Sequence, residues 1–309
     1  MNEVELSIVS PVYKAEKIVA ELVKRIGESA SALTSSYEII LVEDGSPDHS
    51  WEKILEECRK NPNVKGIKLS KNFGQHYAIT AGIGASKGKF VVVMDCDLQD
   101  NPKYIAEMYA RCKSGVDIVY TSKTKRKHSG FKNIAASIYF RVFNYLTENQ
   151  RATDDIGSYS MISRRVADAF LAIKDFHRHY LMVLRLLGFN SDIITIEHDK
   201  RFEGSSSYTF RKLISHGING ITSQSDKLLR ISINIGFGFF IVSLLWAAVI
   251  VLRYFLIGSL PGYTSIMVLL LLSTGLILMS IGVAGIYIGK IFEQVKGRPL
   301  YFIDQKINF

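Results

Sequence analysis

Two long runs without a charged residue, near the C-terminus, set the strongest limit on how this chain can fold. They cover residues 231–252 and 254–289. Since about 20 consecutive apolar residues cross the hydrocarbon core of a bilayer, each run is long enough to form a transmembrane helix. The segment GSLPG at 258–262 favours a turn inside the second run. The sequence therefore predicts two transmembrane helices, about 231–253 and 264–289, joined by a short loop.

Both outer flanks of this apolar region are basic, whereas the connecting loop has no basic residue beyond Arg253. The flanking basic residues are Lys227, Arg230, Lys290, Lys296 and Arg298. Because cytoplasmic flanks carry the excess of Lys and Arg, both ends of the hairpin, and with them the first 230 residues, are expected in the cytoplasm. Gly285 and Gly289 form a GxxxG pair, which permits close helix contact either within the hairpin or between protomers of a homo-oligomer.

The chain has a formal net charge of +9, which fits a membrane-facing surface or a phosphate-bearing substrate. Nucleic acid is disfavoured as a partner, because no basic stripe interleaved with aromatic residues and no nucleic-acid-binding motif is present. The three cysteines, Cys58, Cys96 and Cys112, form no CxxC pair and favour a reducing compartment.

The first 122 residues alternate between apolar, β-rich runs and segments of helical pattern. The predicted strands are 6–13, 37–44, 64–70, 89–96 and 116–122, and the predicted helices are 17–33, 49–60, 75–85 and 102–113. This alternation predicts an α/β fold with a mostly parallel sheet and helices on both faces. Ligands of such sheets bind at the carboxyl ends of the strands.

The region after residue 122 is less regular and more basic, beginning with SKTKRKHSG at 122–130. We expect helices at 131–148, 165–173 and 178–188 and strands at 157–163 and 192–198. Residues 208–230 carry apolar residues at helical spacing with basic residues between them, which predicts an amphipathic helix on the membrane surface.

Carboxylates follow two of the predicted strands. In KFVVVMDCDLQDNP (89–102), Asp95, Asp97 and Asp100 come directly after an apolar run, and Asp44 ends another in VEDGSPD (42–48). Carboxylates this close repel one another unless a cation lies between them. Asp95 and Asp97 are therefore candidate ligands of Mg²⁺ or Mn²⁺, whereas Asp100 fits the alternative of a cap on the next helix.

Two other patterns do not support a site. The glycine-rich GIGASKG (82–88) precedes a strand instead of following one and lacks the spacing of a phosphate loop. His177 and His179 are two residues apart, so a helix would point them to different sides, and a zinc site there is disfavoured.

Several motifs in chain order resemble family 2 glycosyltransferases of the polyprenyl-phosphate type, which include dolichyl-phosphate mannose synthase and bactoprenol glucosyltransferases. They cover essentially the whole chain. They are SPVYKAE (10–16), VEDGSPD (42–48), MDCDLQDNP (94–102), DIGSYSMISRRV (155–166), RFEGSSSY (201–208) and, after the terminal hairpin, KGRPLY (296–301). The resemblance implies a GT-A-like fold with a C-terminal transmembrane hairpin.

The chain departs from the family pattern in three places. Lys14 and Ala15 replace the Asn-Glu usual after Tyr13, which affects a minor part of the nucleotide site. Ser207 stands where Lys is common, so a contact to phosphate is lost or supplied elsewhere. No Gln-x-x-Arg-Trp is present, which argues against a processive polysaccharide synthase.

The resemblance also implies roles for individual residues. Asp95 and Asp97 hold the metal, and Asp97, Gln99 and Asp155 are the catalytic candidates, with Asp155 as base or positioning group and a turn cap as its alternative. The nucleotide-sugar site comprises Pro11, Tyr13, Glu43, Asp44, Asp95 and Arg201. The acceptor-phosphate site comprises Lys123, Lys132 and Arg201, although a basic run such as 123–127 is also typical of a solvated loop.

The implied reaction transfers a hexose, with UDP-glucose favoured as donor, to polyprenyl (undecaprenyl) phosphate with inversion, at the bacterial inner membrane. The implied organisation is a catalytic domain at 1–207, a surface helix at 208–230, the hairpin at 231–289 and a cytoplasmic tail at 290–309. Two alternatives remain at this stage: a membrane transferase that acts directly on another lipid or glycan, and a non-catalytic scaffold that binds a nucleotide sugar.

Overall fold

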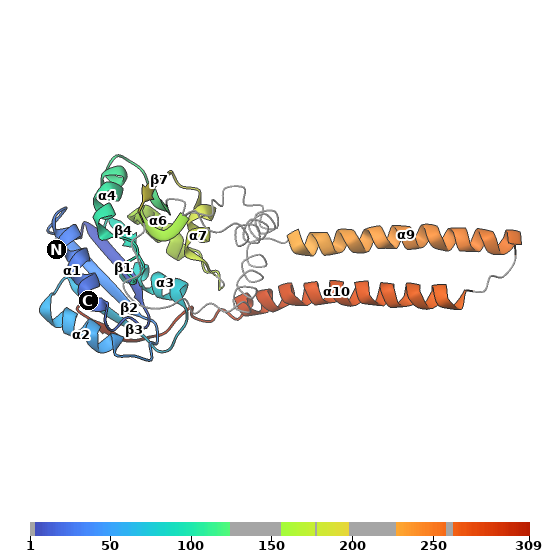
Figure 1. The fold of residues 1–309 in the computed structure, drawn as a ribbon, viewed down its shortest axis with the longest axis horizontal. Helices are drawn as coiled ribbons and strands as arrows, with labels where there is room; N and C mark the ends of the chain where they lie inside the picture. Colours follow the sequence, from blue (N-terminus) through green and yellow to red (C-terminus); the bar gives the residue numbers. More distant parts are fainter. Residues whose placement is uncertain (1–3, 124–155, 177, 198–226, 258–261) are drawn as a thin grey trace. The chain divides into compact units, whose positions relative to one another are not determined.

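The structure is a computed structural model that describes residues 4–123, 156–176, 178–197, 227–257 and 262–309 (Figure 1). The chain divides into two compact units. The sheet unit contains residues 1–128, 153–207 and 298–309, and the helical unit contains residues 129–152 and 208–297. The predicted helix at 131–148, residues 208–226 of the predicted surface helix 208–230, and the residues Lys132, Asp155 and Arg201 lie outside the described residues.

One eight-stranded sheet organises the sheet unit, in the order β7-β5-β6-β4-β1-β2-β3-β8. The strands are β1 Leu6–Val12, β2 Tyr37–Glu43, β3 Val64–Leu69, β4 Phe90–Val93, β5 Ile118–Lys123, β6 Ile156–Ser163, β7 Ser191–Ile196 and β8 Ile303–Ile307. The four central strands β4, β1, β2 and β3 are parallel, as their uninterrupted apolar runs predict. The strands β6 and β8 run antiparallel to their neighbours, so the sheet is mixed, although mostly parallel in its centre.

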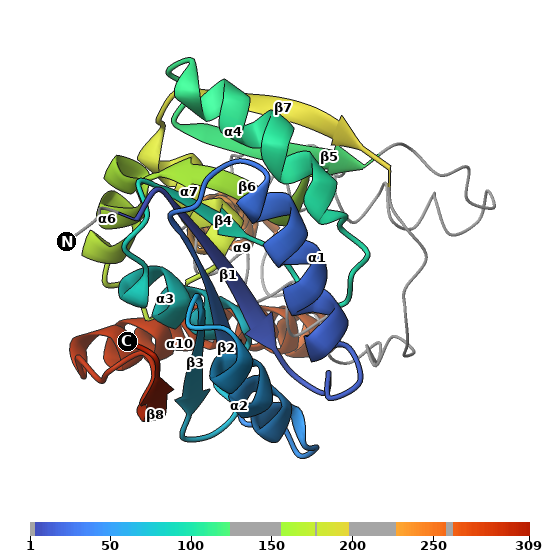
Figure 2. The same ribbon diagram turned by 90° about the vertical axis from the view of Figure 1, so that its left-hand side faces the viewer.

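Helices cover both faces of this sheet, as predicted (Figures 1 and 2). They are α1 Val19–Ser31, α2 Ser50–Lys60, α3 Gln75–Ala85, the 3₁₀ helix η1 Pro102–Tyr104, α4 Ile105–Lys113, α6 Arg164–Ala172 and α7 Tyr180–Leu187. Successive side chains of a strand point to opposite faces, so each strand supplies two cores. Ile8 of β1 packs in the cluster under α1, α2 and α4, whereas Val9 packs in the cluster under α3, α6 and α7.

The glycine-rich segment GIGASKG is explained by this packing. A Cβ atom on Gly82 would lie 2.2 Å from Cγ1 of Val9, and one on Gly88 would lie 2.5 Å from the backbone nitrogen of Ser7. Such distances are shorter than side chains tolerate, so both positions require glycine for close contact with β1. This agrees with the prediction that the segment is not a phosphate loop.

The helical unit contains two long helices, α9 Lys227–Ile257 and α10 Tyr263–Val295, which lie side by side (Figure 1). They occupy the two positions predicted for transmembrane helices. Among the residues that the structure describes, one helical segment, Ser273–Val295, is long and apolar enough to cross a membrane, with a hydropathy of 1.8. The apolar stretch Leu229–Phe239 of α9 is shorter.

Candidate active site

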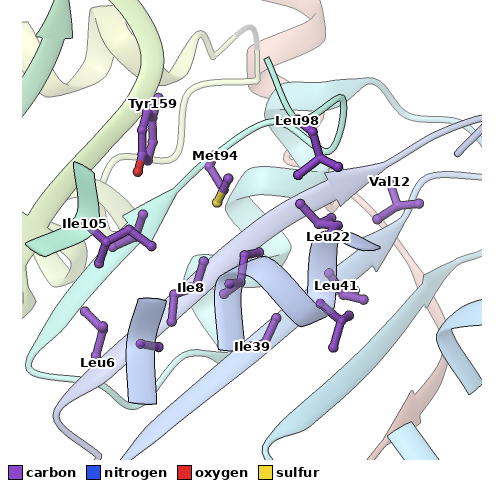
Figure 3. Close-up of a cluster of buried hydrophobic side chains, with 14 of the residues drawn as sticks. Leu6, Ile8, Val12, Leu22, Ile39, Leu41, Met94, Leu98, Ile105 and Tyr159 are labelled. Carbon is purple, nitrogen blue, oxygen red and sulfur yellow. The ribbon is translucent and has the colours of Figure 1, made fainter. Parts of the chain in front are cut away.

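The parallel strands β4, β1, β2 and β3 are neighbours, so their carboxyl ends meet at one edge of the sheet. The loop after β4 carries Asp95 and Asp97 at this edge. Met94 and Leu98 anchor the loop, because both side chains are buried in the cluster beside α1 (Figure 3). Leu98 has a φ of 55°, a left-handed backbone that residues with a Cβ rarely adopt. With the apolar side chains of this loop in the core, the two aspartates between them remain partly exposed.

Asp95 is held by two other segments of the chain. Its Oδ1 accepts a hydrogen bond of 2.7 Å from Nε2 of Gln75, at the start of α3, and one of 3.1 Å from Oγ of Ser158 in β6. The antiparallel pairing of β6 with β4 brings Ser158 to this edge, since Ser160 lies opposite Val93. These two bonds fix the orientation of Asp95.

Asp97 and Gln99 form a tight turn in the same loop. The backbone N–H of Gln99 donates to Oδ1 of Asp97 over 3.1 Å. Asp100 is 4% exposed, and the next residue, Asn101, accepts a bond from the backbone N–H of Lys103 and caps η1. The cap that we expected at Asp100 is therefore supplied by its neighbour.

Asp44 organises the loop that follows β3, which we define as residues 70–75 and call the 70–75 loop. Its Oδ1 accepts a bond of 2.7 Å from the N–H of Phe73 and its Oδ2 one of 2.9 Å from the N–H of Gly74. The side chain of Asn72 donates to the backbone carbonyl of Asp44 over 2.9 Å. Burial raises the pKa of Asp44. Asp44 and Asp95 are thus linked through consecutive residues, Gly74 and Gln75.

Gly45 allows this loop to lie directly on the turn after β2. Gly45 has a φ of 59°, and a Cβ atom there would lie 2.2 Å from the backbone nitrogen of Asn72. Only glycine combines this backbone conformation with this close approach. The turn predicted around Gly45 and Pro47 therefore also packs directly against the backbone of the 70–75 loop.

Glu43 is buried at the end of β2 and is 1% exposed. Its Oε1 accepts a bond from the N–H of Ser46, whereas its Oε2 has no partner among the residues that the structure describes. Burial raises the pKa of this carboxyl group. An unsatisfied buried acceptor costs free energy, so this oxygen is suited to a donor group brought by a ligand or to a proton.

The loops after β1 and β2 are joined to each other. The N–H of Lys14 donates to Oγ of Ser46 over 2.7 Å, and that of Ala15 to Oγ of Ser50 over 3.0 Å. Lys14 has a φ of 53°. Pro11 is buried in β1, whereas Tyr13 is 45% exposed beside the edge where the carboxylates lie.

Cys96, between the two candidate metal ligands, is half-buried, and desolvation raises the pKa of its thiol to about 12. Such a thiol is protonated at neutral pH and is not a nucleophile. No disulfide links the three cysteines, which are free in the structure.

Of the remaining predicted residues, Lys123 is the last residue of β5, whose carboxyl end lies at the same edge because Ser122 pairs with Ile156. Asp155, Lys132 and Arg201 lie outside the described residues. His177 is also outside them, and the ring of His179 packs against that of His76, with centroids 3.9 Å apart.

The sequence-based reasoning missed three residues of this site, namely Asn72, Gln75 and Ser158. The sequence could have indicated Asn72 and Gln75. Ligands bind at the carboxyl ends of parallel strands, and these two residues follow the predicted strand 64–70 just as Asp44 and Asp95 follow theirs. Ser158 could be found only from the antiparallel register of β6 against β4.

The fold and the position of these carboxylates define a GT-A-like glycosyltransferase. Glucosyl-3-phosphoglycerate synthase from Mycobacterium tuberculosis, solved with Mn²⁺, UDP and phosphoglyceric acid, shares the fold with a TM-score of 0.52 and 13% identity, over 71% of this chain and 76% of that one.

The chain belongs to glycosyl transferase family 2, whose sequence model matches residues 7–171. Glycosyltransferase YkcC of Bacillus subtilis, described as uncharacterized, is 33% identical over 98% of this chain and 94% of the relative. Undecaprenyl-phosphate 4-deoxy-4-formamido-L-arabinose transferase of Proteus mirabilis is 30% identical over 98% of this chain and 94% of the relative. The resemblance seen in the motifs, including the polyprenyl-phosphate type, is thereby confirmed, and the protein is a glycosyltransferase with a nucleotide-sugar donor.

Proposed function

We propose that this glycosyltransferase moves a hexose from a nucleotide sugar, with UDP-glucose favoured, to undecaprenyl phosphate or a similar polyprenyl phosphate, and inverts the anomeric carbon. The observation that carries the proposal is the pair Asp95 and Asp97 at the end of β4, where Gln75 and Ser158 orient Asp95 and the N–H of Gln99 bonds to Asp97. The acceptor is suggested by the relative from Proteus mirabilis, whose name specifies undecaprenyl phosphate.

The donor nucleoside is assigned to the carboxyl ends of β1 and β2, where Pro11, Tyr13, Glu43 and Asp44 lie. The unpartnered Oε2 of Glu43 suits an N–H donor of the base. Tyr13, which is 45% exposed, offers a ring for stacking. Asp44 acts by fixing the 70–75 loop, because both of its carboxylate oxygens accept backbone N–H groups of that loop.

The donor pyrophosphate is assigned to the loop after β4, where Asp95 and Asp97 would hold Mg²⁺ or Mn²⁺. The residues fit such an ion: Asp95 and Asp97 are two carboxylates separated by one residue, both partly exposed at the carboxyl end of β4, and Gln75 and Ser158 orient Asp95. Two carboxylates without further protein ligands are typical of an ion that also binds water and substrate phosphates. When bound, the ion neutralises charge on the leaving diphosphate.

The transfer balances without an added base. An oxygen of the acceptor phosphate forms a bond to the anomeric carbon as the bond from that carbon to the diphosphate oxygen breaks, and the electron pair leaves with the nucleoside diphosphate. A phosphate monoester has a second pKa of about 6, so at neutral pH it attacks as a dianion and no proton has to be removed. One displacement inverts the anomeric centre and gives a β-linked product from an α-linked donor.

Asp155, Gln99, Arg201, Lys123 and Lys132 complete the proposed site. Asp155 directly precedes Ile156, the first residue of β6, and that strand supplies Ser158 to Asp95. We assign to Asp155 the positioning of acceptor or sugar, and to Gln99 a contact with the sugar. Lys123, Lys132 and Arg201 would offset the charge that two phosphorylated substrates bring together.

A donor screen tests this function. The full-length protein in detergent is incubated with undecaprenyl phosphate, Mn²⁺ or Mg²⁺ and a panel of UDP- and GDP-sugars, and release of nucleoside diphosphate is measured. We expect release with one sugar, dependent on both lipid phosphate and metal, and a lipid product with inverted configuration by NMR. Release that persists without the lipid phosphate, or that a diacylglycerol or glycan supports instead, would contradict the acceptor assignment.

A further inference from the structure

The last residues of the chain form an edge strand of the sheet. β8 pairs antiparallel with β3, with Gly66 opposite Ile307 and Leu69 opposite Ile303. Nδ2 of Asn308 donates to the backbone carbonyls of Cys58 and Val64, over 2.8 Å each. These bonds fix the C-terminal segment on the same strand that leads into the 70–75 loop.

The segment just before β8 contacts the 70–75 loop directly. The N–H of Ser70 donates to the carbonyl of Phe302 over 2.9 Å, at the point where the register of the β3–β8 ladder shifts. The rings of Phe302 and Phe73 have centroids 6.3 Å apart. The 70–75 loop therefore contacts Phe302 where it leaves β3 and contacts Asp44 further along.

Tyr301 packs against helix α3, the element that follows this loop. It packs against the cluster under α3, α6 and α7, and its hydroxyl would lie 3.5 Å from a Cβ atom on Gly84 of α3. Burial raises the pKa of its phenol, which the nearby guanidinium of Arg178 partly offsets. α3 begins at Gln75, so Tyr301 supports the helix whose first residue holds Asp95.

These contacts make the 70–75 loop a connection with bonds along its whole length. Ser70 bonds to the C-terminal segment, Phe73 and Gly74 bond to Asp44, and Gln75 bonds to Asp95. When a substrate binds, a loop that is already fixed at both ends loses less conformational entropy than a mobile loop does.

We propose that Tyr301 and Phe302 are positioning residues of the donor site, which act through the 70–75 loop and the start of α3 on Asp44 and Asp95. The assignment of the donor to this edge rests on the proposed function. The C-terminal segment after α10 is thus part of the donor site and not only a tail.

Hydrogen exchange of the unliganded full-length protein tests the positioning without any substrate. In Tyr301→Ala, we expect the amides in a peptide covering residues 70–78 to exchange at least 10-fold faster, because those of Phe73 and Gly74 lose their fixed bonds to Asp44. Tyr301→Phe keeps the ring and should exchange at the wild-type rate. Asp304→Ala changes an exposed side chain of β8 and is the matched control. Unchanged exchange of this peptide in Tyr301→Ala would overturn the proposal.

Donor kinetics give a second readout that a merely structural role would not move. With the donor found in the screen, Tyr301→Ala should raise KM about 10-fold and change kcat less than 3-fold, whereas Tyr301→Phe should restore the wild-type KM. A lower yield of folded protein with an unchanged KM would overturn the positioning role. Failure of the lipid acceptor in the screen would count against the proposed function alone, because the exchange experiment uses no acceptor.

Discussion

Asp97 carries the clearest prediction at the scale of single residues. Asp97→Asn keeps the size of the side chain and an oxygen for the turn with Gln99, but removes the charge that holds a divalent ion. We expect turnover to fall by about 100-fold or more, the usual cost of losing an electrostatic contact to developing charge. Activity is measured at saturating Mn²⁺, and circular dichroism confirms the fold. Full activity of this variant with the metal chelated would contradict the metal assignment.

Gln75 offers a test of how Asp95 is oriented. Gln75→Ala removes the donor to Oδ1 of Asp95, and Gln75→Glu replaces it with a carboxylate that repels Asp95. Loss of a partner that orients a metal ligand commonly costs about 10–100-fold in affinity or activity. We therefore expect the apparent Mn²⁺ requirement to rise in Gln75→Ala and further in Gln75→Glu. Identical metal titrations for the wild type and both variants would show that the bond has no such role.

Glu43 predicts a pH dependence of stability. Burial raises the folded-state pKa of Glu43 above its usual value of 4.5, so the folded protein favours the protonated form. The resulting stability is present at low pH and is lost as the pH rises through the folded pKa. A glutamine side chain cannot ionise, so the free energy of unfolding of Glu43→Gln should rise relative to that of the wild type as the pH increases through the folded-state pKa. Above that pH, the difference between the two proteins should stay constant.

The measurement is the thermal midpoint from pH 4 to pH 8. At pH 8, we expect Glu43→Gln to unfold about 2–4 °C above the wild type, the shift that 1 kcal/mol causes in a domain of 150–250 residues. Glu28→Gln, at an exposed position of α1, is the matched control and should change the free energy of unfolding by no more than about 0.5 kcal/mol across this range. A difference for Glu43→Gln that shrinks as the pH rises would contradict the assigned sign.

Among single residues, the sequence predicted which carboxylates follow the carboxyl end of an apolar strand, namely Asp44, Asp95 and Asp97. It did not show that Asp44 would bind the backbone of a loop 30 residues later, because such a bond depends on how two turns approach each other. It also did not show the burial of Glu43, since the neighbouring residues of VEDGSPD suggest an exposed turn.

At the scale of elements, helix α3 shows how packing decides what a glycine does. Gly82→Ala places a Cβ atom 2.2 Å from Cγ1 of Val9, and we expect it to destabilise the fold by about 1–3 kcal/mol, as overpacking does. Gly84→Ala, two residues along the same helix, meets its nearest atoms at 3.5 Å and 3.7 Å, which is ordinary contact. It should be neutral or stabilise the helix by up to about 1 kcal/mol. Thermal unfolding of both variants checks the contrast, and equal effects would contradict it.

Most elements of the sheet unit could be predicted, because their apolar patterns are regular. Helix α3, expected at 75–85, spans these residues in the structure. β8 was missed, since IDQKI has only two apolar residues and gains its stability from pairing with β3 and from the side chain of Asn308. β4 ends at Val93, before the expected residue 96: the N–H of Met94 still donates to the carbonyl of Val9, and the buried side chain of Met94 anchors the loop that carries Asp95.

At the scale of the whole molecule, the pairing of β3 with β8 limits how the chain can meet a membrane. Both strands belong to one sheet and must lie on the same side, so the chain between them crosses an even number of times. Ser273–Val295 of α10 qualifies as one crossing, and a single crossing would separate the two strands. If α10 spans the membrane, a second crossing is required, and α9 is the long apolar helix that precedes it.

Cysteine accessibility in intact spheroplasts tests this topology. Ser259→Cys lies in the sequence between α9 and α10, and Ser114→Cys lies at the exposed end of α4 in the sheet unit. Because the basic flanks of both helices favour the cytoplasm, a membrane-impermeant maleimide should label Ser259→Cys before lysis and Ser114→Cys only after it. The wild type provides the background: Cys58 and Cys112 are buried, and any labelling of the half-buried Cys96 after lysis is subtracted. Labelling of both variants only after lysis would mean that neither helix crosses, and the active site would then reach its lipid acceptor from a surface-bound protein. Labelling of Ser114→Cys before lysis would place the sheet unit outside, away from cytoplasmic nucleotide sugars, and would contradict the orientation on which the proposed reaction depends.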